Sequence, residues 1–410
     1  MATIQDLISR FKKELSDKLI VNEDLERMPT GIDIIDIATG GLPAGGFGLF
    51  TGVSGVGKTL LALNIISSTM KKYPNTVCMI IDAETSLTME RLKQLKVDTN
   101  RVLLIRRVTI EDVFDTVVNK FIEIKSDLNI DDPSIILWDS IASTPTEKEV
   151  VAQRIEEAIG LKARVLSSKL PVLCQKLEKH KTFMIAINQL RENIVINPYD
   201  RKEDMVRGLD GSLPGGVVQY YQSSILLRLK NAGIYNTSGV EINKSTVAQT
   251  KDLQMSSSFI GYKMDLIFLK NKFALKRPLT IIMDPVHGIS NFFTAVHYLT
   301  EYKHISTSGG WYQLDGYAKK FRLREIQDIY NTTPEFKELF DKYYLEVLDN
   351  IKSQLRSDIE QESEDTIQAN TIEEGSKKIE PALNNNNSSE NTVSGGDANV
   401  ENTDASESTK

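Results

Sequence analysis

The 410-residue chain is poor in cysteine, with only Cys78 and Cys174, and both stand among apolar neighbours. Two cysteines cannot build a disulfide framework or a cysteine-based metal cluster, so they are expected to be buried and unreactive. No stretch approaches the roughly twenty apolar residues that a membrane-spanning helix requires. The first nineteen residues mix both charges and lack the apolar centre of a signal peptide. These absences predict a cytoplasmic protein without a membrane partner.

The chain also lacks the basic surplus that would by itself suggest nucleic-acid binding. Its net charge of −7 is uneven: residues 358–410 hold thirteen acidic and three basic residues, so they carry −10 and leave about +3 on the preceding 357 residues. This end is nearly free of large apolar side chains and cannot bury enough surface to fold, which predicts a disordered acidic tail over 357–410. Such a tail is either a solvated appendage or a competitor of nucleic acid for a basic surface.

Apolar runs alternate with helical segments through the middle of the chain, which favours an α/β fold with a mostly parallel sheet flanked by helices. Strands are expected at 47–52, 76–84, 101–108, 134–140 and 182–189. Helices are expected at 60–73, 88–96, 110–128 and 150–180. Three further strands, at 223–231, 264–273 and 278–284, are expected to continue the sheet and to run antiparallel at one edge.

The two ends of the chain follow other patterns. Residues 4–19 place their apolar side chains on one helical stripe, which predicts an N-terminal helix. From residue 288 aromatic residues cluster, and a helical stripe over 336–351 predicts a small C-terminal α/β domain. We therefore divide the chain into an N-terminal helix and linker (1–30), a core (31–287), the small domain (288–356) and the tail (357–410).

The sequence GVSGVGKT at 52–59 has the spacing of a nucleotide phosphate loop, and it stands between a predicted strand and a predicted helix. Gly52, Gly55 and Gly57 allow the backbone to curl so that its N–H groups point at phosphate oxygens. Lys58 is expected to reach the β and γ phosphates, and the Thr59 hydroxyl to bind Mg²⁺. The other nucleotide contacts expected from this loop are Ser54, Val56 and Leu60. The chain is therefore predicted to bind ATP with Mg²⁺.

Carboxylates stand at the ends of two predicted strands. Asp139 ends the strand IILWDS, where it would lie beside the phosphate loop and hold Mg²⁺ with Thr59, although an aspartate at such a place is often only a helix cap. In IIDAET, strand alternation would put Asp82 and Glu84 on the same face. Two carboxylates beside a triphosphate are costly unless one of them orients a water as a general base, and we assign this role to Glu84.

Polar side chains at two later strands admit more than one interpretation. Gln189 closes the apolar strand TFMIAINQ and is either a sensor of the γ phosphate or a capping amide. Lys270 and Lys272 project together from one face of a predicted strand. They either protect the edge of the sheet or deliver charge to a phosphate held by another subunit, as an arginine finger does.

The order of these motifs resembles that of the RecA recombinase family, and the long gaps and acidic tail are similar to its UvsX branch from tailed phages. The motifs lie between about residue 20 and residue 350 and read GGLP, GVSGVGKT, IIDAE, WDS, INQLR, PGG, YYQSS, LKNK and GGWY. The resemblance implies a RecA-type P-loop ATPase core whose N-terminal helix packs on a neighbouring protomer. It implies that Glu84 is the catalytic glutamate and Gln189 the γ-phosphate sensor. It also implies that Lys270 and Lys272 complete the ATP site across a filament interface.

The resemblance further implies two DNA-binding loops, one around 154–164 and one over 190–216. The residues expected to hold DNA phosphates are Arg154, Arg164, Arg191, Gly215 and Gly216. The chain departs from the family at Arg91, which stands where the family often has an aromatic residue that stacks on adenine. The second loop is not net basic, so its grip on phosphates would also use backbone N–H groups near Gly215 and Gly216.

The activity that the resemblance implies is ATP-dependent homologous recombination. A helical filament of many copies would hold single-stranded DNA, pair it with homologous duplex DNA and exchange strands, in recombination, repair and recombination-dependent replication. A single-strand-binding protein and a recombination mediator are the further implied partners. A hexameric helicase built on the same core is one alternative, but it would use an arginine finger and a larger N-terminal collar than the about thirty residues present here. A mediator that binds ATP without strand-exchange activity is the other, and Glu84 argues against it.

Overall fold

The computed structural model describes Lys13 and residues 26–151, 160–190, 211–236, 259–271 and 278–354. Contacts divide the chain into two compact units, Met1–Asp358 and Ile359–Lys410, and every described residue belongs to the first. Some predicted features lie outside the described residues: the helix over 4–19 apart from the helical Lys13, the tail over 357–410, Arg154, Arg191 and Lys272. The predicted boundaries at residues 30, 287 and 356 remain predictions.

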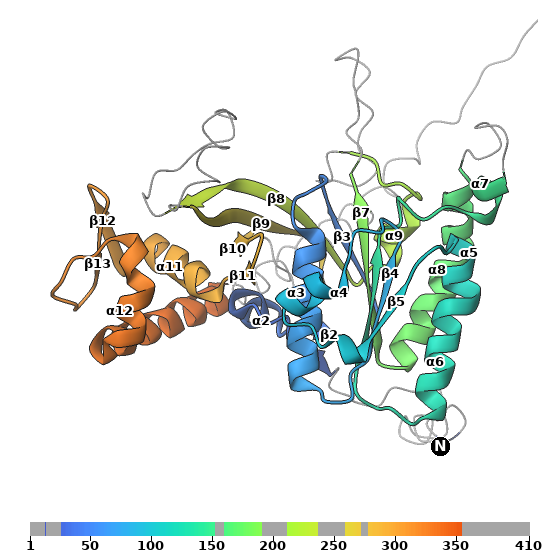
Figure 1. Ribbon diagram of the computed structural model, residues 1–410, viewed down its shortest axis with the longest axis horizontal. Helices are drawn as coiled ribbons and strands as arrows, with labels where there is room; N and C mark the ends of the chain where they lie inside the picture. The colour runs from blue at the N-terminus through green and yellow to red at the C-terminus, as the bar shows by residue number, and fades with distance from the viewer. Residues whose placement is uncertain are drawn as a thin grey trace, which may run out of the picture. The chain divides into compact units, whose positions relative to one another are not determined.

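Nine strands of the described residues form one mixed sheet, in the order β11-β10-β9-β8-β3-β7-β6-β4-β5 (Figure 1). The strands from β8 to β5 run parallel, whereas β9, β10 and β11 add to the sheet in antiparallel fashion at one edge. The strand bounds are β3 Gly46–Gly52, β4 Cys78–Asp82, β5 Val102–Ile105, β6 Ser134–Asp139, β7 Thr182–Gln189, β8 Ile225–Asn236, β9 Phe259–Asn271, β10 Leu279–Asp284 and β11 Gly288–Ile289. The predicted α/β class, with a mostly parallel sheet and an antiparallel edge, is confirmed.

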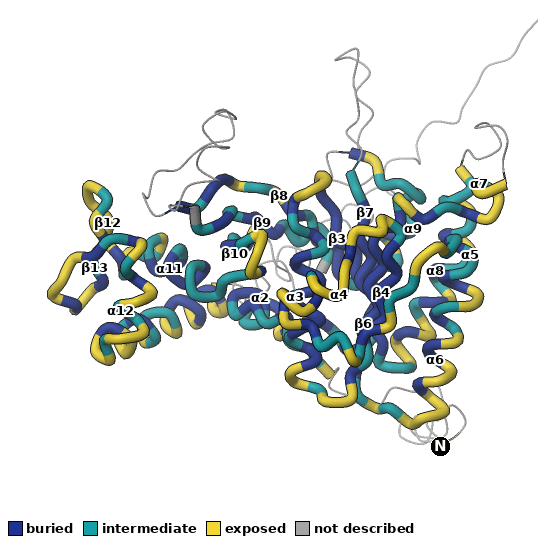
Figure 2. The backbone as a smooth tube through the Cα atoms, viewed as in Figure 1, coloured by how far each residue is buried: buried dark blue, intermediate teal, exposed yellow. Residues whose placement is uncertain are grey.

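Both faces of the sheet are buried, which explains why its strands read as continuous apolar runs. In β6, Ile135 and Leu137 belong to one apolar core, which includes residues of α3 (Lys58–Lys72). Their neighbours Ile136 and Trp138 point to the opposite face and to a second core, which includes residues of α6 (Val118–Asp127) and α8 (Leu161–Lys179). Figure 1 shows α3 on one side of the sheet and α6 with α8 on the other, and Figure 2 shows the central strands buried.

Two predicted helices have different bounds in the structure. The segment 110–128 consists of α5 (Ile110–Asp112), a π-helical turn η2 (Val113–Val117) and α6. Thr109 and Asp112 cap its start by bonding to each other's backbone N–H groups. The segment 150–180 contains the end of α7 (Glu147–Val151) and the whole of α8, and residues 152–159 between these helices lie outside the described part.

The remaining elements outside the large sheet are mostly short. They are β1 Arg27–Met28, β2 Leu42–Pro43, α2 Asp33–Thr39, α4 Met89–Gln94, η1 Thr99–Arg101, α9 Val218–Gln222, α11 Asn291–Glu301, β12 Ile305–Ser308, β13 Trp311–Leu314, η5 Leu323–Glu325, α12 Ile326–Thr332 and a helix over 334–354. None of the helices in the described ranges combines the length and the apolar content that crossing a bilayer requires.

The part of the chain after β11 extends the apolar core beside α3. Its hairpin of β12 and β13 turns at Gly309 and Gly310, where the sequence GGWY led us to expect a turn in a small β element. The predicted aromatic stripe lies on the helix over 334–354, with Phe336 and Phe340 buried in the same core as α3. The ring of Phe292, on α11, stacks on that of Phe340 with centroids 5.3 Å apart.

The register of the parallel strands aligns the ends that carry candidate site residues. Gly52 at the end of β3 lies opposite Gln189 at the end of β7. Asp82 at the end of β4 lies opposite Asp139 at the end of β6. Because β6 pairs with both β4 and β7, the four residues meet at the carboxyl edge of the sheet, where ligands bind in open α/β folds.

Candidate nucleotide site and nucleic-acid interface

The phosphate loop joins the end of β3 at Gly52 to the start of α3 at Lys58. Gly57 has φ +96°, a conformation that favours glycine, and a Cβ atom there would have to displace the end of the Met283 side chain. The first N–H groups of a helix have no partner within that helix and favour an anion. The loop therefore has the backbone form that its sequence predicts.

Lys58 lies inside this loop with a side chain that is almost fully buried. Its Nζ donates hydrogen bonds to the carbonyl oxygens of Gly52 (3.0 Å) and Val53 (2.8 Å). Burial lowers the pKa of Lys58, and the negative charges of Asp139 and Glu84 oppose this shift. The ammonium group is thus held among loop carbonyls, close to two carboxylates.

Thr59 and Asp139 meet across the start of α3 and the end of β6. The Thr59 hydroxyl donates a hydrogen bond of 2.7 Å to Asp139 Oδ2. The pKa of Asp139 is raised to about 6, chiefly by burial and also by the charges of Glu84 and Asp82, while Thr59 and Lys58 oppose the shift. The peptide bond between Asp139 and Ser140 is cis.

A buried carboxylate next to a threonine hydroxyl is an all-oxygen donor pair of the kind Mg²⁺ uses, with the rest of its shell supplied by water and phosphate. Among the described residues there is no cluster of three or more histidine, cysteine, aspartate or glutamate side chains that could hold a metal. Thr59 and Asp139 therefore fit Mg²⁺ bound together with a nucleotide, and do not form a self-sufficient metal cage.

Glu84 lies in the turn after β4 rather than on the strand, because β4 ends at Asp82. The expectation that strand alternation puts Asp82 and Glu84 on one face is therefore wrong. Glu84 Oε1 accepts hydrogen bonds from Ser140 Oγ (2.8 Å), Ser143 Oγ (3.2 Å) and Gln189 Nε2 (3.0 Å). These donors come from two other segments of the chain and orient one carboxylate oxygen.

Asp82 has a partner that the sequence analysis did not identify. The fully buried carboxylate forms a salt bridge of 2.9 Å with Arg106, which follows β5. It also accepts hydrogen bonds from the backbone N–H groups of Ser86 (3.1 Å) and Leu87 (3.2 Å). Asp82 thereby holds the 82–87 turn that carries Glu84, and its charge is compensated without a nucleotide.

A cavity of about 250 Å³ joins these groups. Its lining comprises Ser54, Gly55, Gly57, Lys58, Thr59, Leu60, Leu63, Glu84, Leu87, Arg91, Leu95, Asp139, Ile187 and Gln189. Most of the predicted nucleotide contacts are in this set. The apolar wall formed by Leu63, Leu87 and Leu95 was not expected, because isolated leucines on helices and turns resemble ordinary core residues in the sequence.

Arg91 is on α4 at the edge of this cavity. Its guanidinium donates hydrogen bonds to the carbonyl oxygens of Pro285 and Val286, and to Gln94 Oε1. Arg91 stands at the position where the family resemblance predicts contact with the adenine. These hydrogen bonds fix its side chain to the turn between β10 and β11. A guanidinium held in this way can offer a flat face to a base.

Three of the predicted DNA contacts lie near one another around the start of α8. Arg164 is exposed in the first turn of α8. Gly215 has φ +87°, and a Cβ atom there would overlap Leu166 of α8 and come within 2.9 Å of Gln219 Nε2. A Cβ atom on Gly216 would lie 3.1 Å from that of Ala163. The glycines are thus required for the close approach of the 211–217 segment to α8.

Lys270 lies near the end of β9 and contacts α9 of its own chain. Its Nζ donates hydrogen bonds to the carbonyl oxygens of Tyr220 (2.8 Å) and Tyr221 (2.7 Å), and it lies 5.2 Å from the ring centroid of Tyr220. Lys270 is not among the described residues that line the nucleotide cavity.

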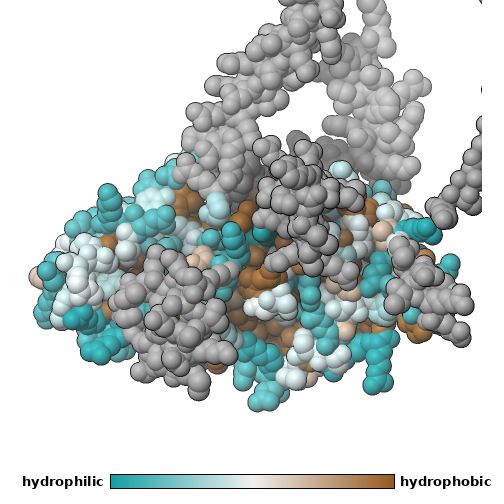
Figure 3. Space-filling model, turned by 90° about the horizontal axis from the view of Figure 1, so that it is seen from above, coloured by the Kyte–Doolittle hydropathy of each residue, from teal (hydrophilic) through white to brown (hydrophobic). Residues whose placement is uncertain are grey.

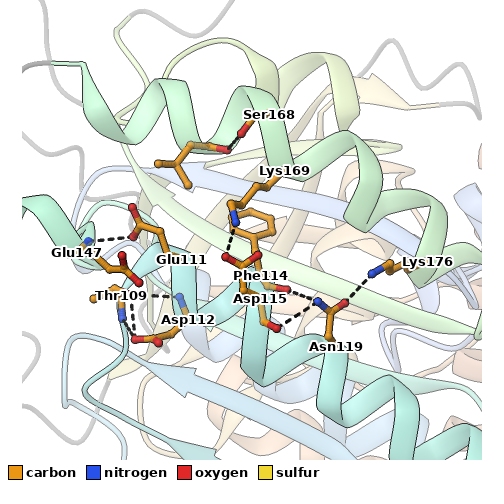
Figure 4. A network of polar contacts seen from close by, with 11 residues as sticks. Thr109, Glu111, Asp112, Phe114, Asp115, Asn119, Glu147, Ser168, Lys169 and Lys176 are labelled. Atoms are coloured by element: carbon orange, nitrogen blue, oxygen red, sulfur yellow. Dashed lines mark hydrogen bonds and ion pairs between the residues drawn. The ribbon is translucent and has the colours of Figure 1, made fainter.

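Polar contacts join α7 and α8, the helices before and after residues 152–159, to α5, η2 and α6 (Figure 4). Lys169 of α8 forms a salt bridge with Asp115, and Lys176 donates to Asn119 Oδ1 (2.9 Å). Asn119 in turn donates to the carbonyl oxygen of Phe114, in the π-helical turn (2.8 Å). Figure 4 also shows Glu111, which accepts a hydrogen bond of 2.9 Å from the backbone of Glu147 at the start of α7.

Comparison with known proteins adds evidence that covers most of the chain. A family model described as the RecA N-terminal domain matches residues 2–272. The chain is 28% identical over 294 residues to Protein RecA of Mycoplasma mycoides, covering 71% of this chain and 75% of that protein. It is 26% identical over 330 residues to Protein RecA of Aquifex aeolicus, covering 79% of this chain and 84% of that protein. It is 27% identical over 361 residues to Protein RecA of Ureaplasma parvum, covering 86% of this chain and 96% of that protein. With a family model that spans well over half of its length and a phosphate loop at the expected sheet edge, the chain belongs to the RecA family.

Proposed function

We propose that this protein is a DNA-dependent ATPase that forms helical filaments on single-stranded DNA and catalyses homologous pairing and strand exchange. Membership of the RecA family supports an ATP-driven recombinase in general. The observation that supports the proposal most is that Lys58, Thr59, Glu84, Asp139 and Gln189 all line one cavity. Groups that bind phosphate, hold a metal and activate water must act on the same triphosphate, so they have to converge in this way.

In the proposed reaction, a water molecule attacks the γ phosphorus of ATP, the bond to the bridging oxygen breaks, and ADP and phosphate leave. Glu84 accepts the proton of the attacking water, because its carboxylate is already oriented by three donors. Lys58 places its positive charge on the phosphate oxygens. Thr59 and Asp139 would hold Mg²⁺, which when bound screens the charge of the β and γ phosphates.

We propose that the ATP site is completed by a neighbouring copy through Lys270 and Lys272. Large apolar side chains exposed beside the nucleotide cavity, Val53 in the phosphate loop and Val286 in the turn after β10, support such an interface. Figure 3 likewise shows apolar surface reaching the solvent between hydrophilic regions on the face seen from above. A head-to-tail contact of this kind that does not close on itself produces a filament.

The proposed DNA-binding residues are Arg154, Arg164, Arg191, Gly215 and Gly216. The closeness of the last two to α8 supports a joint surface with Arg164. Sequence specificity would come from base pairing between strands, since phosphate contacts carry no sequence information. The long gaps between motifs and the acidic C-terminal composition support a place among the UvsX-type recombinases of tailed phages, acting in the host cytoplasm with a single-strand-binding protein and a mediator.

The proposal is tested by electron microscopy and a strand-exchange assay on the same preparation. With ATP, Mg²⁺ and single-stranded DNA, we expect extended helical filaments, and transfer of a strand from homologous but not from unrelated duplex. Closed rings that unwind duplex DNA would instead identify a hexameric helicase. ATP binding without filaments or strand transfer would identify a mediator.

A further inference from the structure

Two fully buried amide side chains lie between the nucleotide cavity and the 211–217 segment. Asn188 is the penultimate residue of β7, directly before Gln189, and Gln219 lies on α9. Both have no exposed surface. A buried amide is costly unless it is hydrogen-bonded, so the partners of this pair define what it holds in place.

The partners of Gln219 and Asn188 join the two sides of the pair. Asn188 Nδ2 donates to Gln219 Oε1 (2.8 Å) and to the carbonyl oxygen of Pro214 (2.8 Å). Gln219 Nε2 donates to the carbonyl oxygens of Pro214 (2.7 Å) and Gly216 (3.2 Å). Each amide nitrogen therefore uses both of its hydrogens, and each amide oxygen accepts a bond.

The same pair reaches the candidate catalytic carboxylate. Asn188 Oδ1 accepts a hydrogen bond of 3.0 Å from the backbone N–H of Gln189, whose side chain donates to Glu84. Hydrogen bonds thus connect Glu84 to the Gln189 side chain, and the Gln189 backbone to Asn188, Gln219 and Gly216. A displacement that reaches the Gln189 backbone would either shift Asn188 and the 211–217 segment or leave Asn188 Oδ1 without its donor.

We propose that Asn188 and Gln219 are positioning residues that couple the nucleotide cavity to the 211–217 segment. This inference rests on the proposed function, in which that segment contacts single-stranded DNA. A nucleotide that moves the Gln189 side chain changes the affinity of the segment for DNA, and DNA bound there changes the orientation of Glu84. Coupling of this kind is reciprocal, and it typically changes affinity by about 5- to 150-fold.

The test replaces Gln219 by methionine, which keeps the volume and removes all of its hydrogen bonds. In Gln219→Met, we expect the ratio of single-stranded DNA affinities with ATP analogue and with ADP to fall about 5-fold or more. We expect ADP affinity and ATP turnover without DNA to stay within about 2-fold, because neither amide lines the nucleotide cavity. Gln222→Met is the matched control, since it makes the same change on the same helix outside this network.

A second variant and a wild-type measurement separate coupling from simple loss of stability. Asn188→Ala should also reduce the ratio of single-stranded DNA affinities with ATP analogue and with ADP. In the double variant this ratio should fall no further than in the more affected single variant, because both residues act in one network. In the wild type, hydrogen exchange of residues 211–222 should slow when a non-hydrolysable ATP analogue binds.

The outcomes distinguish this inference from the proposed function. The coupling role of the amide pair is refuted if wild-type turnover responds to DNA and the variants keep the full response. It is also refuted if hydrogen exchange of residues 211–222 is the same with and without the nucleotide. If wild-type turnover and affinity show no link between nucleotide and DNA at all, the proposed function fails and the inference fails with it.

Discussion

Gln189 Nε2 donates a hydrogen bond of 3.0 Å to Glu84 Oε1, although 105 residues separate the two positions in the chain. The amide extends from the end of β7 across β6 to the turn after β4. Glu84 is therefore held by a residue whose own backbone contacts the buried pair of Asn188 and Gln219. This relationship gives the candidate general base a defined orientation, and the site roles can be tested around it.

Glu84→Gln should abolish ATP turnover while keeping nucleotide and DNA binding. The amide is nearly isosteric but cannot accept the proton of the attacking water, so we expect kcat to fall by about 10²- to 10⁴-fold. Glu90→Gln, on the exposed face of α4, is the matched control. Turnover of Glu84→Gln close to that of the control would remove Glu84 from the role of base.

Lys58→Ala should weaken binding of the triphosphate itself. Loss of a charge-assisted hydrogen bond, worth about 1.5 to 3 kcal/mol, corresponds to an affinity about 10- to 100-fold lower. Equilibrium binding of a fluorescent ATP analogue measures the effect, with Lys71→Ala at the exposed end of the same helix as the control. An ATP affinity equal to that of the control would mean that the loop does not bind phosphate through Lys58.

Mixing Lys270→Ala with Glu84→Gln protein should restore part of the ATPase activity if the lysine acts on a neighbouring subunit. A junction is intact when the Lys270→Ala protomer supplies Glu84 and the Glu84→Gln protomer supplies Lys270. When the two proteins are mixed in equal amounts, random head-to-tail assembly makes about a quarter of all junctions intact. Activity is measured against the mixing ratio with single-stranded DNA. A mixture no more active than its separate components would place Lys270 in a role within its own chain, where it contacts Tyr220 and Tyr221.

Arg106→Met should destabilise the protein by leaving the buried carboxylate of Asp82 without its cation. We expect the free energy of unfolding to fall by about 1 to 3 kcal/mol, less than for a fully buried pair, because the Arg106 side chain is 37% exposed. Urea unfolding measures the change, and Arg107→Met at the adjacent exposed position is the control. Adding Asp82→Asn to Arg106→Met should recover part of the loss. No recovery would show that Arg106 acts through packing and not through its charge.

Lys125 gives the protein a pH-dependent stability far from the nucleotide site. Burial lowers its pKa to about 8; the negative charges of Asp131, Asp132 and Glu26 oppose this shift, and Lys181 reinforces it. In the unfolded chain the amine titrates near 10.5, so between about pH 8 and 10.5 the unfolded state binds more protons than the folded state. The free energy of unfolding therefore rises with pH in that range.

The measurement compares urea unfolding of the wild type and Lys125→Met at pH 7 and pH 9.5. The difference between the two proteins should shift by up to about 2 kcal/mol in favour of the wild type at the higher pH. Lys120→Met, on the exposed face of α6, should show no such shift. A pH-independent difference for Lys125→Met would mean that the amine titrates normally in the folded protein.

Local sequence determined the phosphate loop and the strand that ends in Asp139. The form of the loop depends on glycine conformations within eight consecutive residues, and the strands were recognisable because a sheet buried on both faces requires continuous apolar runs. The candidate metal pair of Thr59 and Asp139 also followed, since Thr59 belongs to the phosphate-loop motif and Asp139 ends a strand that the sequence identifies. Because the strands were recognisable from their apolar runs, the α/β class and the antiparallel edge could also be predicted.

Only the tertiary structure decided which side chains meet. Arg106 reaches Asp82 because β5 lies beside β4 in the sheet. Gln189 reaches Glu84 because only β6 lies between β7 and β4. Gln219 is buried next to Asn188. Strand order and register are set by the burial of the whole sheet, to which residues far apart in the chain contribute, so no local pattern encodes these pairings. A buried glutamine on a five-residue helix resembles any polar loop residue until its neighbours are in place.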